Sequence, residues 1–453
     1  MVRLSRAQQQ ERTRSAVLAA AREEFAEHTY AEAKVDRIAE RAELTRGAVY
    51  SNFPSKRALY LAVLLDSIEQ PAPTPATRNR IAAPAPSPIR PAPPVEPTSS
   101  LGPSPIGPTP DPVPSSGALG EALGAVARVW LERLPLVGDS PARGNLQLRS
   151  LTGVIDDGPG RAALAQVTRV EALLLGLALE SCVARRMRPQ RPRPQPARKV
   201  RLAAMVLTLL NGAGQLAESA PGVGDPFDVE RTCEHLAGLD LADTWDRPLL
   251  AYVVPARPAD EVWQPPTEAG DGFGLQGGDL ADQLTGHDVD FDRDGVIVVL
   301  GTGRLGAAEE AIRAVRGTSP RGLSGGAVEP ADDQVIVAVV TSDPAELGRL
   351  VRLRIGDLTG CLRQVFGPDA WPGIRIVLDD HAAIASAIGV EATDATEAAV
   401  RIQGGKIIAR AEGRGAAHAA ATAVQNHKTA VQDQKSAAQD RKTAAQGQQS
   451  VHE

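Results

Sequence analysis

Apolar side chains near the N-terminus recur at the spacing of short amphipathic helices. Val17 and Phe25 share one face of a first helix, and a second amphipathic helix follows at residues 35–42. A third short helix, at residues 45–52, begins with a polar residue of the kind that caps helices. The pattern therefore predicts a small helical unit over residues 1–70, in which the second and third helices form a helix-turn-helix.

A second helical pattern covers residues 118–246. Apolar residues recur at helical spacing near its start, and two later helices, residues 161–187 and 199–217, are apolar through most of their length. Helices this apolar need a surface against which they can be buried. The pattern predicts an all-α domain whose last helices pack against a partner surface.

From residue 247 onward, short apolar runs alternate with amphipathic segments. Such alternation is typical of a mostly parallel sheet with helices on both faces. The predicted strands are residues 249–254, 296–300, 335–340 and 374–378, with a closing hairpin of residues 398–402 and 406–410 that turns at Gly404 and Gly405. The predicted helices are residues 307–315, 345–354 and 382–388, with a last helix from about Gly415. We therefore expect an α/β domain over residues 247–424.

Two other segments lack the apolar positions of a packed core. Residues 71–117 consist mainly of Pro, Ala, Ser and Thr, which predicts an extended linker. This linker is either a disordered insertion without a role or a segment with a tether or docking role. Residues 425–453 contain a seven-residue repeat whose apolar residues are adjacent, so they form no coiled-coil seam. A disordered tail is the prediction there.

Composition limits the partners and the compartment. The net charge is -6, so any affinity for a polyanion must come from a local surface. Three scattered cysteines show no zinc spacing and indicate a reducing cytoplasm. The polar N-terminus does not resemble a signal peptide. The stretch closest to a membrane span, residues 202–217, is interrupted by polar residues and glycines. We expect a cytoplasmic protein without membrane contact, metal or cofactor.

The residues around the third helix have the chemistry of DNA recognition. A helix that enters the major groove needs a small, polar first turn, so that it can approach the base edges. Arg46 is the side chain there that can fork onto a guanine, and the polar residues that follow suit phosphate contacts. The predicted DNA-binding residues are Lys34, Thr45, Arg46, Gly47, Ala48, Tyr50, Ser51, Asn52 and Lys56. The competing interpretation is a plain helical bundle whose aromatic residues are core.

At these positions the chain resembles the TetR family of bacterial repressors, over about the first seventy residues. The matching residues are Arg14 to Leu18, Ala20, Ala21, Phe25, Tyr30, Val35 to Ala39, Ala42, Gly47, Val49, Tyr50, Asn52, Phe53, Ser55, Lys56 and Leu59. The resemblance implies a homodimer that binds a palindromic operator in double-stranded DNA and responds to an unknown small-molecule effector. Lys34 stands where the family favours Thr or Ser as a helix cap, and can approach a phosphate instead.

The C-terminal region resembles the thioredoxin and peroxiredoxin fold at residues 292–299, 377–390 and 404–407. The loop at residues 301–306 has no cysteine, and residues 394–397 have no proline, so the resemblance implies this fold without its chemistry. We predict no enzymatic activity. The alternative is a redox- or nucleotide-dependent enzyme domain fused to a DNA-binding head, because the glycines of residues 301–306 match a dinucleotide-binding pattern.

Overall fold

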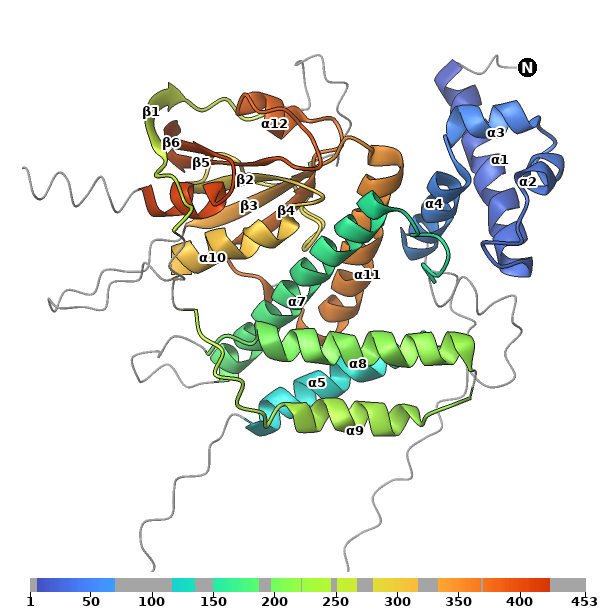
Figure 1. The fold of residues 1–453 in the computed structure, drawn as a ribbon, viewed down its shortest axis with the longest axis horizontal. Coiled ribbons are helices and arrows are strands. Elements are labelled where there is room, and N and C mark those ends of the chain that lie inside the picture. The colour runs from blue at the N-terminus through green and yellow to red at the C-terminus, as the bar shows by residue number, and fades with distance from the viewer. Residues whose placement is uncertain are drawn as a thin grey trace, which may run out of the picture.

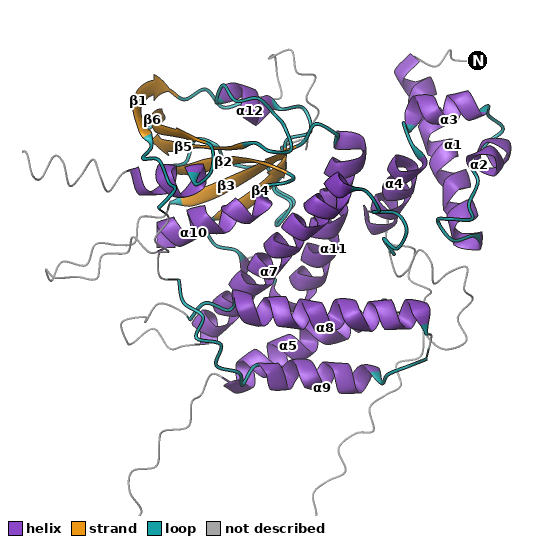
Figure 2. Cartoon of the chain, viewed as in Figure 1, coloured by secondary structure: helices purple, strands orange, loops and turns teal. Residues whose placement is uncertain are grey.

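The computed structural model describes residues 6–69, 116–134, 150–186, 197–220, 222–245, 251–266, 280–316, 333–367 and 370–423. Figure 1 shows a helical unit at the N-terminus, a sheet at the opposite side of the molecule, and long helices between and below them. All named strands of the described chain lie in this sheet, between residues 257 and 412, and the other two regions are helical (Figure 2). Residues 71–115 of the predicted linker and the tail at residues 425–453 lie outside the described residues, and residues 116–117 of the predicted linker belong to a helix.

The N-terminal head contains α1 (Arg6–Glu27), α2 (Val35–Arg41), α3 (Arg46–Asn52) and α4 (Lys56–Glu69). Val17, Phe25, Ile38 and Phe53 are buried together in its core. The ring of Phe25 meets the ring of Tyr60 on α4 edge to face, with centroids 4.9 Å apart. The predicted helix-turn-helix is therefore confirmed.

The turn between α2 and α3 is fixed by its backbone. Glu43 adopts a left-handed conformation with a φ of 56°. The amide of Leu44, the next residue, donates to the carbonyl oxygen of Ala39 at 2.9 Å. A left-handed residue that closes a helix in this way sets the direction of the chain into the next helix. The orientation of α3 against α2 thus follows from local hydrogen bonds.

The second region contains α5 (Ser116–Leu131), α7 (Gly158–Arg186), α8 (Val200–Ser219) and α9 (Pro226–Leu236). The helices α7 and α8 correspond to the two predicted apolar helices. The sequence analysis did not predict α9, whose apolar stripe consists only of Val229, Cys233 and Leu236. Its start is well defined, because the side chain of Asp225 accepts a hydrogen bond from the amide of Phe227 at 2.9 Å.

Two segments among the described residues, Gly158–Ala184 and Val200–Ser219, are long and apolar enough to cross a membrane. Residues 202–217, within α8, were expected to come closest to a membrane span but not to reach its length, and α7 was not expected to come close; both expectations are wrong. Core helices of proteins outside membranes pass the same test, and 67% of the most apolar window of α7 is buried inside the structure. The corresponding share for α8 is 33%, so much of this helix is exposed on its outer face.

The third region contains a six-stranded sheet in the order β1-β6-β5-β2-β3-β4. Its strands are β1 (Arg257–Val262), β2 (Gly295–Gly301), β3 (Gln334–Val340), β4 (Ile374–Leu378), β5 (Glu397–Gln403) and β6 (Lys406–Glu412). The pairs β2–β3 and β3–β4 are parallel, whereas β2–β5, β5–β6 and β1–β6 are antiparallel. The prediction of a mostly parallel sheet is therefore wrong, because the C-terminal hairpin and β1 extend one edge in the antiparallel sense.

The predicted strand boundaries agree with the structure except at the first strand. Residues 251–254 lie outside any strand, and β1 begins at Arg257. The closing hairpin is confirmed as β5 and β6. Gly404 and Gly405 have φ values of 57° and 71°, as a two-residue turn with left-handed central residues requires.

Helices and loops cover both faces of the sheet, as predicted. Alternate residues of β2 point to opposite faces, so Val298 packs with the helical region and Val299 packs with the other face. The helices on the sheet are α10 (Ala308–Arg316), which follows the short turn η1 (Leu305–Ala307), and α12 (Ala383–Ala387). The finer assignment, a thioredoxin-like fold, stays a prediction.

One helix joins all three regions. The chain after β3 forms a helical turn, η2 (Pro344–Gly348), and continues as α11 (Arg349–Phe366), which lies beside α7 (Figure 1). Leu350 of α11 is buried in the core of the head, and Leu358 is buried in the core that the helical region shares with the sheet. The predicted domains at residues 118–246 and 247–424 therefore share one continuous core.

Polar contacts fix α11 and η2 against the head and against α7. Arg57 of α4 pairs with Glu346 of η2, and Arg349 donates to the carbonyl oxygen of Ala58 at 2.9 Å. Arg354 pairs with the buried carboxylate of Glu171 at 2.7 Å. The head thus rests on a helix that belongs to the C-terminal region.

Candidate nucleic-acid interface

The helix α3 presents most of the predicted DNA-binding residues on its exposed face. The hydroxyl of Thr45 caps the helix by accepting a hydrogen bond from the amide of Ala48 at 3.2 Å. Thr45, Arg46, Gly47, Tyr50 and Ser51 are exposed. A Cβ added at Gly47 would meet only the Thr45 hydroxyl, at 3.9 Å, so the first turn offers an open approach to another molecule.

Arg46 is held in place before any partner arrives. Its guanidinium pairs with the carboxylate of Asp36 on α2 at 3.2 Å and lies 5.5 Å from the centre of the Tyr50 ring. Both members of the ion pair are 60% exposed, so water screens the attraction strongly. Asp36 was not among the predicted site residues. Its ion pair with Arg46 would have to break before Arg46 could contact a base or a phosphate.

Several predicted contacts are partly occupied by the protein itself. The Asn52 side-chain amide and the Ser51 hydroxyl each donate to the carbonyl oxygen of Ala48 at 2.9 Å. The ammonium group of Lys56 donates to the carbonyl oxygen of Ala31 at 3.3 Å and lies over the Tyr30 ring. Burial lowers the pKa of Lys56.

Lys34 is exposed at the start of α2 and makes no side-chain cap, as its position suggested. Glu24 of α1 supplies an acceptor for the amide of Lys34 itself. Its carboxylate is fully buried and accepts from the Lys34 amide at 3.0 Å and from Nε of Arg37 at 2.7 Å. Burial alone would raise the pKa of Glu24, but these two partners hold it below its ordinary value.

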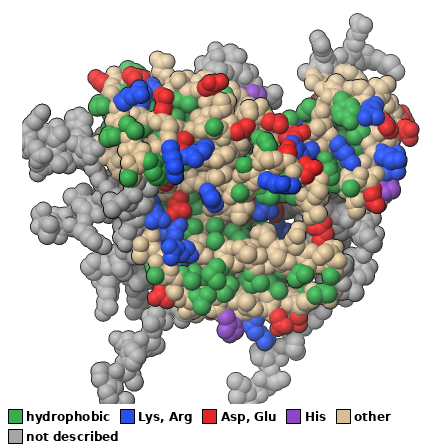
Figure 3. Space-filling model, viewed as in Figure 1, with side chains coloured by type: hydrophobic (Ala, Val, Ile, Leu, Met, Phe, Trp, Pro, Cys, Tyr) green, Lys and Arg blue, Asp and Glu red, His purple; other side chains and the backbone are tan. Residues whose placement is uncertain are grey.

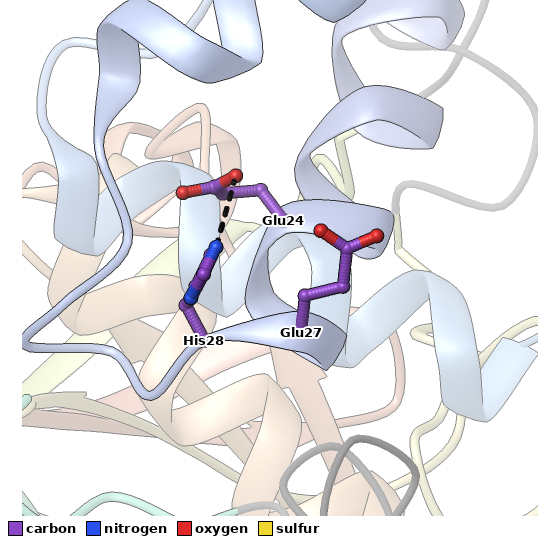
Figure 4. Close-up of side chains that lie close together, drawn as sticks. All are labelled: Glu24, Glu27 and His28. Atoms are coloured by element: carbon purple, nitrogen blue, oxygen red, sulfur yellow. Dashed lines mark ion pairs between the residues drawn. The ribbon is translucent and has the colours of Figure 1, made fainter.

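Glu24 belongs to a cluster with Glu27 and His28 at the end of α1 (Figure 4). Oxygen and nitrogen atoms of these side chains lie close enough together to suggest a cation site. However, Arg41 pairs with both carboxylates, and Arg37 pairs with Glu24. Two guanidinium groups oppose a metal ion, so the cluster is better explained as the ion-pair network that joins α1 to α2.

Replacing Glu24 by Gln is expected to destabilise the protein by about 2 kcal/mol at neutral pH, the range of a hydrogen bond to a charged group. Because the folded-state pKa is lowered, this contribution is present above the unfolded-state pKa and is lost as the pH falls through the folded-state value. Urea unfolding at pH 7 and at about pH 3 measures the difference. An equal difference between wild type and Glu24→Gln at both pH values would contradict the role of the carboxylate charge.

Comparison with known proteins identifies the head. Residues 17–63 match the family described as bacterial regulatory proteins, tetR family. A TetR transcriptional regulator from Rhodococcus sp. RHA1 is 16% identical in sequence, with a TM-score of 0.25, and the match covers 51% of this chain and 94% of that one. NalD, the secondary repressor of the MexAB-OprM multidrug efflux pump in Pseudomonas aeruginosa, is 20% identical, with a TM-score of 0.25 and coverage of 50% and 93%. No curated protein matches the chain.

Residues 17–63 are a TetR-family helix-turn-helix domain. The match runs from the middle of α1 into α4 and includes the whole of α2 and α3. The similar structures, at a TM-score of 0.25, add nothing to this assignment. The TetR-family match ends before the linker, so the rest of the chain has to be interpreted from its own geometry.

The glycine-rich loop after β2, residues 301–306, does not form an open cradle for a phosphate group. A Cβ at Gly301 would lie 2.3 Å from the carbonyl oxygen of Thr393, and one at Gly303 would lie 2.8 Å from that of Asp394. The Asp394 carboxylate accepts hydrogen bonds from the hydroxyls of Thr302 at 2.7 Å and Thr341 at 2.6 Å. The chain's own carboxylate thus occupies the ends of β2 and β3, and close packing accounts for these glycines.

A cavity of about 370 Å³ lies among α5, α7, α8 and α11. Its wall combines apolar side chains, among them Trp130 and Leu210, with charged groups, among them Arg354 and Asp357 of α11. Ser150 also lines it, and the carbonyl oxygen of Ser150 accepts a hydrogen bond from the Tyr60 hydroxyl of α4 at 3.0 Å. Ser150 therefore links the cavity to α4 of the head.

Proposed function

We propose that the protein is a cytoplasmic transcriptional repressor that binds a palindromic operator in double-stranded DNA as a homodimer. The observation that carries this proposal is the exposed face of α3, capped by Thr45 and carrying Arg46, within a TetR-family helix-turn-helix. Arg46 would read a base edge in the major groove. Tyr50, Ser51, Asn52, Lys56 and Lys34 would hold the DNA backbone.

The outer face of α8 and α9 supports the homodimer. Met205 and Leu216 of α8 are 42% and 51% exposed, and Phe227 of α9 is 72% exposed. Figure 3 shows apolar side chains gathered over these helices on the face nearest the viewer. Large exposed apolar patches mark association surfaces, and a second copy of the chain would bury this one. Sedimentation velocity measures the outcome, and a monomer at micromolar concentration would count against the homodimer.

The cavity among α5, α7, α8 and α11 is our candidate for the effector site. Its volume of about 370 Å³ falls in the range of small-molecule sites, about 300–1,000 Å³. A ligand that displaces the Ser150 backbone would act on Tyr60, and through it on the rings of Phe25 and Tyr30 in the head. The mixed lining favours an amphipathic effector.

Selection of DNA from a random pool by the purified full chain tests the function. We expect enrichment of sequences with two inverted half-sites whose centres are separated by about one helical turn or a multiple of it. Binding to the enriched sequence should weaken with rising salt, since phosphate contacts release counterions. Recovery of no preferred sequence would reject operator recognition, and recovery of isolated half-sites would reject the dimer.

A further inference from the structure

A groove separate from the effector cavity lies where the helical region meets the sheet region. Its volume is about 630 Å³, within the range of small-molecule sites. One wall is formed by α7 and the start of α8, and the other by η1, α10 and the loops that carry Tyr252 and Arg414. The two walls come from segments far apart in the sequence, so no local sequence motif predicts this site.

Arginine dominates the lining of the groove. Its charged residues are Arg169, Arg198, Arg201, Arg304, Arg313, Arg414, Glu309 and Glu310. Figure 3 shows Lys and Arg side chains gathered beside α10 and the start of α8. Such an excess of positive charge in a concave surface attracts anions, because low-dielectric walls focus the field.

Four of these arginines are matched by carboxylates of the protein. Arg198 and Arg201 pair with Asp243, Arg198 and Arg313 also share Glu309, and Arg304 pairs with Glu397. In the part of the chain that the structure describes, Arg169 and Arg414 have no carboxylate within ion-pair distance. Arg414 instead lies over the Tyr252 ring, with its Cζ 4.1 Å from the ring centre, and both residues line the groove.

Buried polar atoms in the lining provide an independent observation. The side chain of Arg198 is 8% exposed, and its Nε has no hydrogen-bond partner among the described residues. The Oε2 atom of Glu310 is also buried and has no hydrogen-bond partner among the described residues. Buried polar atoms nearly always have a partner, so unpaired atoms in a groove wall point to a polar group that binds there. Burial first, and then the charge of Glu397, raise the pKa of Glu310, which reduces its opposition to an anion.

We propose that this groove binds a small polyanion, a compound that carries several carboxylate or phosphate groups. Arg169 on α7 and Arg414 after β6 would be its direct ligands, since a guanidinium can donate two parallel hydrogen bonds to either group. The bound compound would join the helical region to the sheet region. This proposal does not depend on DNA binding.

Isothermal titration of the full chain with pyrophosphate and with citrate, at low ionic strength, tests the site. We expect saturable binding of at least one probe, and at least a tenfold weaker Kd for an Arg169→Gln, Arg414→Gln variant. An Arg161→Gln, Arg257→Gln variant is the matched control, because it loses the same charge at exposed positions outside the groove. The control should bind as wild type does.

The Glu310→Gln variant neutralises the groove carboxylate that pairs with no arginine among the described residues, and it should bind at least as tightly as wild type at pH 8. Absence of saturable binding to the wild-type chain would overturn the proposal. So would an equal loss of affinity in the control and in the Arg169→Gln, Arg414→Gln variant, which would show attraction by net charge alone. Thermal unfolding without ligand verifies that each variant is folded.

Discussion

An Arg46→Ala, Tyr50→Ala, Lys56→Ala variant is expected to bind the selected operator at least about a hundredfold more weakly than wild type. Loss of a base contact by arginine costs about 1–3 kcal/mol, and loss of two backbone contacts adds to this. The ion pair between Arg46 and Asp36 reduces the effect only slightly, because both groups are well exposed. Gel shifts at a fixed salt concentration measure the change.

The matched control for this prediction is an Arg257→Ala, Lys406→Ala variant. It removes the same positive charge from exposed positions on β1 and β6, at the far side of the molecule from α3 (Figure 1). The control should retain wild-type affinity. Because Lys56 also contacts Ala31 and Tyr30 inside the head, an Arg46→Ala, Tyr50→Ala variant tests the exposed contacts alone. Undiminished specific binding by both altered heads would reject the assigned interface.

Replacing Leu350 of α11 by Ala is expected to cost about 3 kcal/mol and to loosen the DNA-binding head. The side chain is fully buried, and removal of a buried leucine costs about 2–5 kcal/mol in transfer and cavity energy. The lost contacts lie in the core that α11 shares with α1 and α4. Hydrogen exchange should therefore show faster opening of α4, and operator affinity should fall with it.

Leu358→Ala is the control for the head-specific part of this result. Leu358 lies two turns further along the same helix and is equally buried, but it packs into the core shared by the helical region and the sheet. We expect similar global destabilisation and a smaller effect on exchange in α4. Equal acceleration of exchange in α4 by both variants would mean that the head and the other regions unfold as one unit, and it would contradict specific support by α11.

The role of α11 changes the interpretation of the linker. In the sequence, the Pro-rich segment after α4 separates the head from the helical region. A rigid helical connection, through which a TetR-type helical domain would act on the head, is therefore not expected there. The ion pair between Arg57 and Glu346 and the buried Leu350 supply a path through space instead. The sheet region is therefore in contact with α4 through η2 and α11, independently of residues 70–115.

The sequence by itself determined the features whose causes are local. The helix-turn-helix follows from apolar spacing and from the cap at Thr45, and the C-terminal hairpin follows from two glycines that allow left-handed backbone. Whether each segment of the sheet region forms a strand or a helix was also predictable, because the period of its apolar positions can be seen within about ten residues. The first strand was misplaced where that local signal is weakest, since β1 is an exposed edge.

Only the tertiary structure decided which distant segments meet. Local periodicity shows that a face is buried but does not show what buries it, so the docking of α11 on the head was not predictable. For the same reason, the sequence did not reveal the hydrogen bond from the Lys34 amide to Glu24, the pairing of Arg46 with Asp36, or the arginine groove at the junction. These contacts depend on chain direction and packing over separations of ten to more than two hundred residues. The sequence thus specified a helix-turn-helix head of the TetR type, and the fold decided which other segments pack against it.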